Sequence, residues 1–375
     1  MKTFEIDAKD IADQYGFTYD EINIKEIEKG NINNTFVIIL KKGKSEKKYL
    51  CQRVNTKVFT KPFSLMRNIQ NVTTYISNYY KNNGDSKHKT LEVIPTTTGS
   101  PLYITKNALG DNEFFRVYNY IDNSVSYDKT DDDAIIKTAG KAFGSFSRAL
   151  NGYPTDLVEE TIENFHNTPL RYKKFLQDLE IDAAKRSKNT KEEIEFFKSK
   201  KEEYGLIYDK IKNGEIPIRV THNDTKINNV MLDKNSNDYI AVIDLDTVMP
   251  GSILYDYGDG VRSSCATRVE DSKDISNVDI DNKLFEAYTE GFLSEVAKVL
   301  KEKEVDNMAN SIKIMTLELA LRFYNDYING DTYFRTTYSD HNLVRTRNQI
   351  ELVRKIEKKK DYLESTIHRI YDKYK

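Results

Sequence analysis

The apolar positions in the first third of the chain come in short β-branched runs separated by polar turns. Phe36–Leu40 reads F-V-I-I-L, the turn K-K-G-K-S-E-K-K follows, and Tyr49–Val54 is a second apolar run. Runs of this length around a short turn are typical of hairpin strands. With Tyr19–Lys29 before them, the pattern predicts two hairpin connections in series.

A helical pattern then interrupts the predicted strands. Pro62 stands where a helix can begin, and residues 63–80 carry apolar side chains at helical spacing, namely Leu65, Ile69, Val72 and Ile76. Two more short apolar runs, Leu91–Pro95 and Glu113–Ile121, predict further strands. Residues 1–121 are therefore expected to form a small antiparallel β-lobe with one helix.

The pattern changes after Asp122 and becomes mainly helical. Asp131–Leu150 is predicted to be a helix, and its stretch A-G-K-A-F-G-S-F (Ala139–Phe146) suits close helix packing. Charged helical segments fill Thr168–Asn213, and residues after Ile280 are again helical. Residues 122–375 are expected to form a larger helical lobe, so the whole chain is predicted to be α+β and bilobal.

Inside the second lobe, residues 216–248 form a β interlude rich in carboxylates and amides. Its segment T-H-N-D-T-K-I-N-N-V-M-L contains His222, Asp224 and Asn229, and the following hairpin ends in I-D-L-D with Asp244. A loop between strands and the end of the next hairpin are expected to lie side by side, which would bring Asp224, Asn229 and Asp244 together.

That residue set suits phosphoryl transfer. One carboxylate can accept the proton of an attacking hydroxyl, while an amide oxygen and a second carboxylate are apt ligands for Mg²⁺ on a nucleotide. His222 is expected to brace the loop by a hydrogen bond to backbone or to the Asp244 region. The alternative is that these Asp and Asn side chains only cap backbone amides in turns.

Composition narrows the function classes. The 375 residues include 57 basic and 59 acidic side chains, a net charge of −2, so neither a nucleic-acid footprint nor a membrane-binding face is indicated. The two cysteines, Cys51 and Cys265, form no C-x-x-C, which argues against a disulfide scaffold or a thiolate metal site. The first residues lack an apolar signal core, so a cytoplasmic protein without an obligate protein partner is expected.

Several motifs together resemble the aminoglycoside phosphotransferase / choline kinase family of small-molecule kinases. These are the β-lobe, the H-x-D-x-x-x-x-N loop and the I-D-x-D strand end. The segments G-N-I-N-N-T-F, C-Q-R-V-N, V-I-D-L-D-T-V-M-P-G, D-Y-G-D-G-V-R and R-F-Y-N-D-Y-I-N-G-D-T-Y-F are similar to a narrower subgroup, the N-acetylhexosamine 1-kinases. The resemblance implies a protein-kinase-like fold and phosphorylation of the anomeric hydroxyl of GlcNAc or GalNAc, with ATP as co-substrate and Mg²⁺ as cofactor.

The resemblance also implies roles for single residues. Asp224 is expected to be the catalytic base, and Asn229 and Asp244 the Mg²⁺ ligands. The nucleotide is expected to contact a phosphate loop, a strand residue and a backbone hinge, namely Gly30, Asn33, Thr35, Arg53, Tyr120 and Ile121. Arg322 and Tyr333 are expected to hold the sugar, and a guanidinium suits hydroxyl or amide oxygens. The alternative for Arg322 is a surface ion pair.

One departure from the kinase pattern concerns the strand lysine that normally pairs with a glutamate of the first helix. The matching strand reads Y-L-C-Q-R-V, so Gln52 or Arg53 must replace the lysine, and the helix after Pro62 offers Arg67 and Asn68 but no Glu near its start. Kinases of choline, amino alcohols, aminoglycosides or other sugars remain open, as does a nucleotide-binding pseudokinase.

Overall fold

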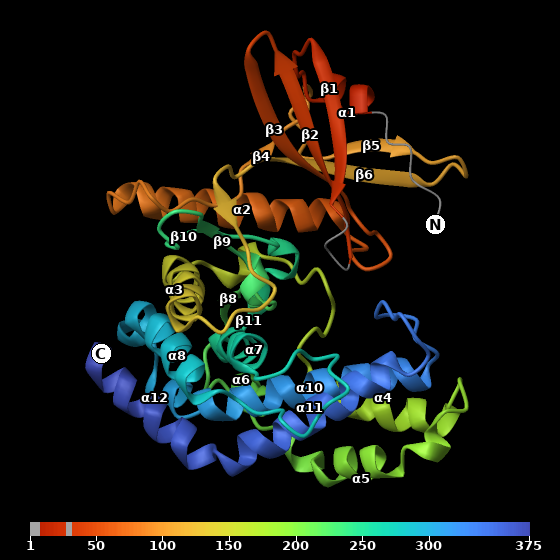
Figure 1. Cartoon of the computed structure of the whole chain (residues 1–375), viewed down its shortest axis with the longest axis vertical. Helices are drawn as coiled ribbons and strands as arrows, with labels where there is room; N and C mark the ends of the chain where they lie inside the picture. Colours follow the sequence, from red (N-terminus) through yellow and green to blue (C-terminus); the bar gives the residue numbers. More distant parts are fainter. Residues whose placement is uncertain (1–7, 28–31) are drawn as a thin grey trace. The chain divides into compact units, whose positions relative to one another are not determined.

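The computed structural model describes residues 8–27 and 32–375, and the chain separates into two compact units. The first ends at Ser124 and the second begins at Val125, three residues after the predicted boundary. The first unit is built around an antiparallel sheet and the second is mainly helical (Figure 1), which confirms the predicted fold class.

The N-terminal unit contains a six-stranded sheet with the order β1-β2-β3-β6-β4, and β5 pairs with β6. All of these pairs are antiparallel. The strands are β1 (Glu21–Ile27), β2 (Asn34–Lys42), β3 (Ser45–Arg53), β4 (Val93–Ile94), β5 (Tyr103–Lys106) and β6 (Asn112–Asn119), and the helices are α1 (Ala8–Gln14) and α2 (Pro62–Asn82).

Most elements of this unit lie where the sequence pattern predicts them. The serial hairpins are β1-β2 and β2-β3, and α2 begins at Pro62. The short α1 and β5 were not predicted. Helix α1 has only seven residues, of which Ile11 and Ala12 are buried, so it offers too short a window for a helical period.

The two faces of the sheet have different surroundings. One face carries a buried apolar cluster that includes Phe36, Cys51 and Val117 and is completed by Ile11 and Tyr15 at α1. On the opposite face, Met66 of α2 approaches Arg116 of β6. Because side chains alternate along a strand, neighbouring residues of β3 point to different surroundings.

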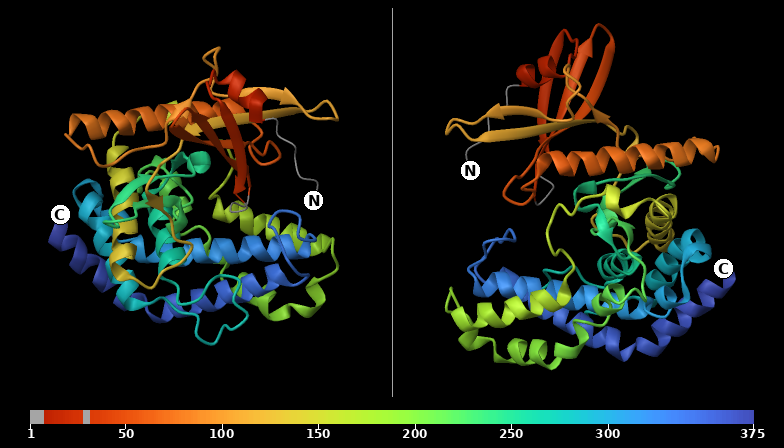
Figure 2. Two further views of the ribbon diagram at one scale, coloured as in Figure 1. Left: turned by 45° about the horizontal axis from the view of Figure 1, so that its top comes forward. Right: turned by 180° about the vertical axis from the view of Figure 1, so that it is seen from behind.

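The C-terminal unit combines helices with two small sheets (Figures 1 and 2). The helices are α3 (Asp133–Ala149), α4 (Thr168–Ile181), α5 (Lys191–Ser199), α6 (Tyr208–Lys212), α7 (Ile253–Cys265), α8 (Asn282–Val296), α9 (Glu302–Val305), α10 (Met308–Ile328), α11 (His341–Lys358) and α12 (Lys360–Tyr374). The sheets have the orders β10-β9-β7 and β11-β8, formed by β7 (Ser124–Val125), β8 (Arg219–Thr221), β9 (Val230–Asp233), β10 (Tyr239–Val242) and β11 (Met249–Gly251).

The small residues of α3 serve the close packing that the sequence predicts. A Cβ atom on Gly140 would overlap the carbonyl oxygen of Tyr288, and one on Gly144 would overlap that of Phe292. Both partners lie on α8, so glycine is required where these two helices approach.

Helix α10 lies beside α4, α7 and α11 (Figure 2), and its buried side chains contribute to the main aromatic core of this unit. Its residues Glu318, Arg322 and Asp326 are spaced by four and therefore lie along one helical face. This face becomes important for the candidate site.

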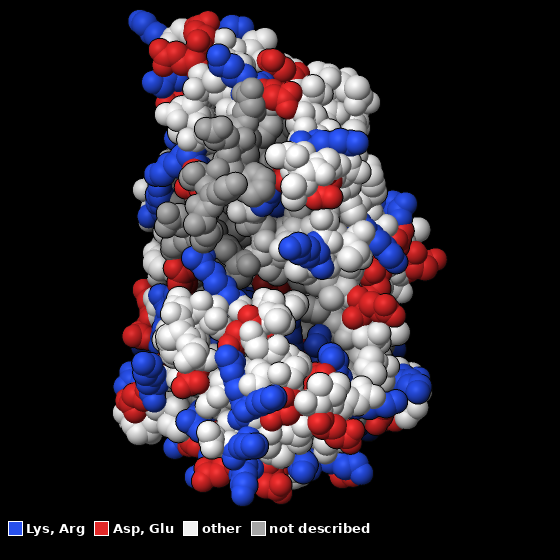
Figure 3. All heavy atoms as spheres, turned by 90° about the vertical axis from the view of Figure 1, so that its right-hand side faces the viewer, with Lys and Arg blue, Asp and Glu red and all other residues white. Residues whose placement is uncertain are grey.

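Charged side chains of both signs are interspersed on the face shown in Figure 3. Within the described parts of the chain, none of the helices combines the length and the apolar character needed to cross a bilayer.

Candidate functional site

The polar segment that follows β8 is anchored to α7 by one buried carboxylate. Asp256 accepts hydrogen bonds from the backbone N–H groups of His222 (2.9 Å) and Asn223 (2.7 Å), and its carbonyl accepts the Thr225 hydroxyl (2.6 Å). Burial raises the pKa of the Asp256 carboxyl, although His222 and these hydrogen bonds oppose the shift. Asn223 has a φ of 65°, a left-handed conformation that asparagine tolerates better than most residues.

The strands on either side of this loop do not pair with each other. Strand β8 pairs with β11, whereas β9 pairs with β10. The loop therefore connects two different sheets, with a 3₁₀ turn at Ile227–Asn229 directly before β9.

His222 braces the loop, as predicted. Its side chain is buried, and its Nδ1 accepts the backbone N–H of Asp224 at 3.2 Å. The ring proton then lies on Nε2, which donates to the carbonyl of Ile243 at 2.9 Å. The rings of Phe143 and Phe146 meet the imidazole edge to face at 5.5 and 5.6 Å. These contacts tie the loop to the strand end that carries Asp244.

The structure brings Asp224 and Asn229 into direct contact. Nδ2 of Asn229 donates to the Asp224 carbonyl at 2.8 Å and to its Oδ2 at 3.2 Å. The Asn229 carbonyl accepts the backbone N–H of Ile243 at 2.9 Å, and Asp244 comes next in the chain. Asp244 is exposed and has a φ of 59°, so it turns the chain at the end of the hairpin.

Lys226 forms an ion pair with Asp224. Its Nζ lies 3.0 Å from Oδ1, with the two side chains 38% and 26% exposed. Burial raises the pKa of the Asp224 carboxyl, but the Lys226 charge and the Asn229 hydrogen bond outweigh it, so the net pKa is below its usual value. In turn, Asp224 raises the pKa of Lys226. Asp224 is thus a carboxylate at neutral pH with a partner on each oxygen.

Asn229 and Asp244 have the donor chemistry of a magnesium site. Since Nδ2 of Asn229 binds Asp224, its amide oxygen is directed elsewhere and can meet a cation. In residues 8–27 and 32–375, no three His, Cys, Asp or Glu side chains gather as a metal site by themselves. The pair therefore fits Mg²⁺ that takes its other ligands from phosphates and water, as is usual for this ion.

The residues predicted to bind nucleotide lie in the N-terminal unit. Gly30 is outside the described residues. Oδ1 of Asn33 accepts the backbone N–H of Asn55 at 2.9 Å. Tyr120 and Ile121 follow β6, and the Ile121 carbonyl accepts the Ser124 hydroxyl at 2.6 Å. These contacts fix Asn33 in the predicted phosphate loop and Ile121 in the predicted hinge.

Gln52 and Arg53, the two candidates for replacing the strand lysine, contact different partners. Arg53 forms an ion pair with Glu113 at 2.7 Å and donates to Asn34 at 2.7 Å. Gln52 accepts two hydrogen bonds from buried Arg116, at 3.0 and 2.7 Å, and donates to the Thr35 hydroxyl at 3.1 Å. A glutamine–arginine pair across β3 and β6 therefore occupies the position beside the predicted phosphate loop.

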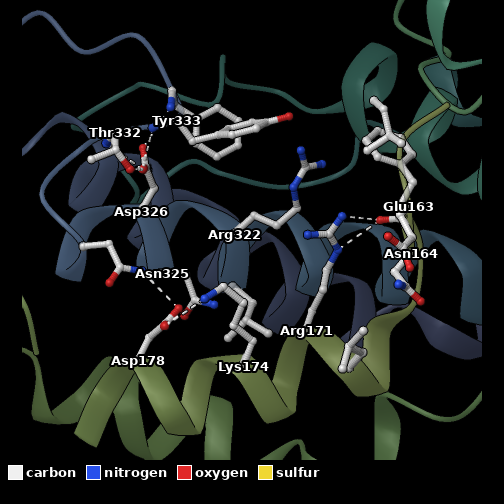
Figure 4. Close-up of a pocket in the computed structure, with 16 residues that line it drawn as sticks. Glu163, Asn164, Arg171, Lys174, Asp178, Arg322, Asn325, Asp326, Thr332 and Tyr333 are labelled. Carbon is white, nitrogen blue, oxygen red and sulfur yellow. Dashed lines mark hydrogen bonds and ion pairs between the residues drawn. The ribbon is translucent and has the colours of Figure 1, made fainter. Parts of the chain in front are cut away.

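The C-terminal unit contains a cavity of about 500 Å³ whose lining includes Arg322 and Tyr333 (Figure 4). The guanidinium carbon of Arg322 lies 5.3 Å from the ring of Phe165, 5.7 Å from that of Tyr333 and 5.5 Å from that of Phe334. Among the described residues Arg322 makes no hydrogen bond or ion pair, so its N–H donors remain available to a ligand. The predicted pair is thus brought together in one pocket.

A second arginine in the wall is already paired. Nε of Arg171 lies 3.3 Å from Oε1 of Glu318 and donates to the Phe165 carbonyl at 3.0 Å. Glu318 is only 1% exposed and also meets Nδ1 of His166 at 3.1 Å. Both contacts are made to Oε1 of Glu318, and Arg322, one turn further along α10, makes no direct ion pair among the described residues, although its charge helps to lower the pKa of Glu318.

The cavity wall is joined to the strand end that carries Asp244. The Thr161 hydroxyl donates to the carbonyl of Asp246 at 3.2 Å, and the backbone N–H of Ile162 lies 3.3 Å from the Met249 sulfur. Ile162 lines the cavity, so the pocket and the loop of Asp224 belong to one connected part of the C-terminal unit.

Sequence reasoning missed several residues that shape the site. The anchoring Asp256 lies in the quoted motif D-Y-G-D-G-V-R, and the pocket residue Asp326 lies in R-F-Y-N-D-Y-I-N-G-D-T-Y-F. Their presence in these motifs was the only signal. Glu318, Arg171 and the ion pair of Lys226 depend on contacts that no local pattern reveals.

Comparisons with solved structures give the same fold. A microcompartment-associated aminopropanol kinase is 13% identical, with 96% of this chain and 99% of that chain covered and a TM-score of 0.59. Amicoumacin kinase hAmiN, solved with AMP-PNP, Ca²⁺ and Ami, is 12% identical, with 92% of this chain and 91% of that chain covered and a TM-score of 0.58. A choline kinase from Cryptosporidium parvum Iowa II is 14% identical over 93% of each chain, with a TM-score of 0.53.

At sequence identities this low, the comparisons show only that the chain shares a kinase-like bilobal fold with these proteins. The family model described as "Phosphotransferase enzyme family" (APH) matches residues 23–275, which is more than half of the chain and includes most of the β-lobe, the Asp224 loop and Asp244. The chain therefore belongs to the APH phosphotransferase enzyme family.

Proposed function

We propose that this phosphotransferase transfers the γ-phosphoryl group of ATP to the anomeric hydroxyl of N-acetylhexosamines, giving the sugar 1-phosphate. Family membership supports the reaction class, and the motif resemblance supports the sugar. The observation that carries the choice of acceptor is the pocket around Arg322, whose guanidinium makes no direct ion pair among the described residues.

The positive charge of Arg322 in this pocket disfavours a positively charged acceptor. Lys174 and Asn329 contact the Asp178 carboxylate at 2.9 and 3.0 Å, and Arg171 and His166 both contact Oε1 of Glu318. A quaternary ammonium or an aminoglycoside would meet the positive charge of Arg322 in a pocket whose lining also carries Glu163, Asp178 and Asp326. A neutral sugar avoids that repulsion.

The pocket also offers complementary hydrogen-bonding groups to an acylated sugar. Arg322 supplies N–H donors. Asn325 lies three residues further along the same helix, and its buried Oδ1 has no hydrogen-bond partner among the described residues. An acetamido group carries one carbonyl acceptor and one N–H donor, and sugar hydroxyls carry both functions. This pairing supports an N-acetylhexosamine over a simple alkyl alcohol.

In the proposed reaction Asp224 takes the proton of the anomeric hydroxyl as its oxygen attacks the γ-phosphorus. The bond from that phosphorus to the bridging oxygen breaks, and ADP leaves with the bond's electrons. Lys226 must leave Oδ1 to free the base, and its partly exposed side chain can then meet the transferring group. Asn229 and Asp244 would hold Mg²⁺, which neutralises phosphate charge when bound.

The nucleotide contacts are proposed for the N-terminal unit. The amides at Gly30, Asn33 and Thr35 would meet the phosphates, and the backbone at Tyr120 and Ile121 would read the adenine. Arg53 is held by Glu113 in the structure. Its proposed phosphate contact therefore requires that ion pair to open.

The Lys226→Met variant is expected to shift the acid limb of the kcat/KM profile to higher pH. Lys226 holds the pKa of Asp224 below its usual value, so loss of the charge raises that pKa and protonates the base at higher pH. Lys226→Arg keeps the charge and serves as the control. The measurement is a pH–rate profile at limiting sugar, and an unmoved acid limb would contradict this role.

An acceptor panel tests the proposed function directly. The protein is incubated with ATP and Mg²⁺ and with GlcNAc, GalNAc, glucose, choline or kanamycin, and ADP release is measured. We expect ADP release with GlcNAc or GalNAc to exceed that with choline and kanamycin. Turnover of choline or kanamycin alone would reject the sugar. Nucleotide binding with no turnover of any acceptor would indicate a binding-only protein.

A further inference from the structure

We propose that Asp326 is a positioning residue that sets the affinity for the acceptor by holding two aromatic rings around Arg322. The proposal rests on the proposed function. Asp326 lies near the end of α10 and is 6% exposed. It is not expected to touch the substrate, because its carboxylate is filled by donors from the following loop and from α11.

Three consecutive backbone amides converge on this carboxylate. Oδ1 accepts the N–H groups of Thr332 and Tyr333, each at 2.8 Å, and Oδ2 accepts that of Phe334 at 2.9 Å. Figure 4 shows Asp326 beside Thr332 and Tyr333, with Arg322 further along the same helix. One side chain thus fixes the backbone of the whole segment that carries the rings.

The same carboxylate also links the loop to the next helix. Oδ2 accepts Nδ2 of Asn342 at 2.9 Å, and that nitrogen also donates to Asp331 at 2.9 Å. Gly330 and Asp331 have φ values of 92° and 60°, so two left-handed residues reverse the chain after α10. The reversal delivers residues 332–334 to Asp326.

Backbone fixation matters because burial does not hold Tyr333 in place. Its side chain is 52% exposed, yet its ring lies over the Arg322 guanidinium together with that of Phe334. Phe165 contacts the guanidinium from another segment and does not depend on Asp326. The ring of Phe334 also packs on that of Phe323 in α10, with centroids 4.6 Å apart, so loss of the Asp326 contacts is expected to loosen the backbone under both rings and to displace Tyr333 most.

The test compares Asp326→Asn with the wild type. An amide keeps the side-chain volume but replaces an acceptor oxygen with a donor, so at least one loop amide loses its partner. We expect the sugar KM to rise about tenfold, equivalent to roughly 1.4 kcal/mol of binding. We expect kcat at saturating sugar and the calorimetric affinity for ATP to be unchanged.

Two further variants separate positioning from general destabilisation. Asp340→Asn changes an exposed carboxylate of the same connection that accepts no loop amide, and its sugar KM should stay at the wild-type value. In a Tyr333→Ala background, Asp326→Asn should raise KM by much less than in the wild type, because the two residues act in series. Additive effects of the two changes would overturn the proposal.

Hydrogen exchange of the amides of residues 332–334 gives a readout that needs no substrate. These amides should exchange slowly in the ligand-free wild type and faster in Asp326→Asn. Faster exchange with an unchanged sugar KM would overturn the positioning role and leave the proposed function intact. A joint loss of thermal stability, ATP affinity and sugar binding would also overturn it, because the role would then be structural.

Failure of the proposed function has a different signature. If the wild type phosphorylates another alcohol on the panel but no sugar, the sugar assignment fails, and a selective rise in KM for that alcohol still supports Asp326. If no acceptor gives ADP with the wild type, the acceptor role of the pocket is overturned together with the function.

Discussion

In the Asp224→Asn variant, the kcat of phosphoryl transfer is expected to fall by a factor on the order of 10²–10⁴, which is the contribution of a positioned general base. Asparagine preserves the size of the side chain but cannot accept the proton of the acceptor hydroxyl. Asp224 is well placed for that task, because Lys226 and Asn229 keep it ionised and oriented. Nucleotide binding should persist, since the metal ligands proposed here are other residues.

The measurement combines steady-state ADP release with calorimetric titration of ATP in the presence of Mg²⁺. Asp238→Asn provides the control, because Asp238 is an exposed carboxylate on the turn of the neighbouring hairpin. A kcat equal to that of the wild type in Asp224→Asn would remove Asp224 from the role of base.

The Asp244→Ala variant is expected to lose at least about tenfold in Mg²⁺-dependent affinity for ATP, which corresponds to roughly 1.4 kcal/mol. A carboxylate is a strong magnesium ligand, and Asn229 alone offers only a neutral oxygen. In EDTA the variant and the wild type should bind nucleotide with the same affinity, because the binding energy that the variant loses comes from the contact between Asp244 and Mg²⁺.

Backbone conformation must be separated from metal binding in this comparison. Asp244 has a φ of 59°, which alanine adopts less readily than asparagine. Asp244→Asn therefore keeps the backbone preference while removing the charge, and it should weaken the Mg²⁺ effect without loss of thermal stability. Identical Mg²⁺ dependence in all three proteins would exclude Asp244 from the metal site.

Much of the order of elements could be predicted from local pattern, because the longer strands and helices each show their own period of apolar residues. Strands β2 and β3 and helix α2 follow directly from their apolar spacing. Strand β11 could not be found in this way. It is three residues long, contains Pro250, and pairs with β8 across the whole β9-β10 hairpin. Such pairing is decided by tertiary contacts and not by strand propensity.

In the candidate site, too, some features follow from a local sequence pattern and others depend on tertiary contacts. The spacing of His222, Asp224 and Asn229 was sufficient to predict a braced polar loop, since all three lie within one short segment. The choice between Gln52 and Arg53 depended on which face of β3 each side chain occupies. Asp326 could not be recognised from the sequence, because its role depends on three backbone amides of the following loop, which only the folded chain brings to its carboxylate.

The phosphorylated product tests the central claim most directly. The protein is incubated with ATP, Mg²⁺ and GlcNAc, and ³¹P–¹H correlation NMR of the purified product identifies the proton coupled to phosphorus. Phosphorus coupled to the anomeric proton, with loss of the reducing end, is the predicted result. Phosphorus at another hydroxyl, or no sugar phosphate while choline or kanamycin is phosphorylated, would contradict the proposed reaction.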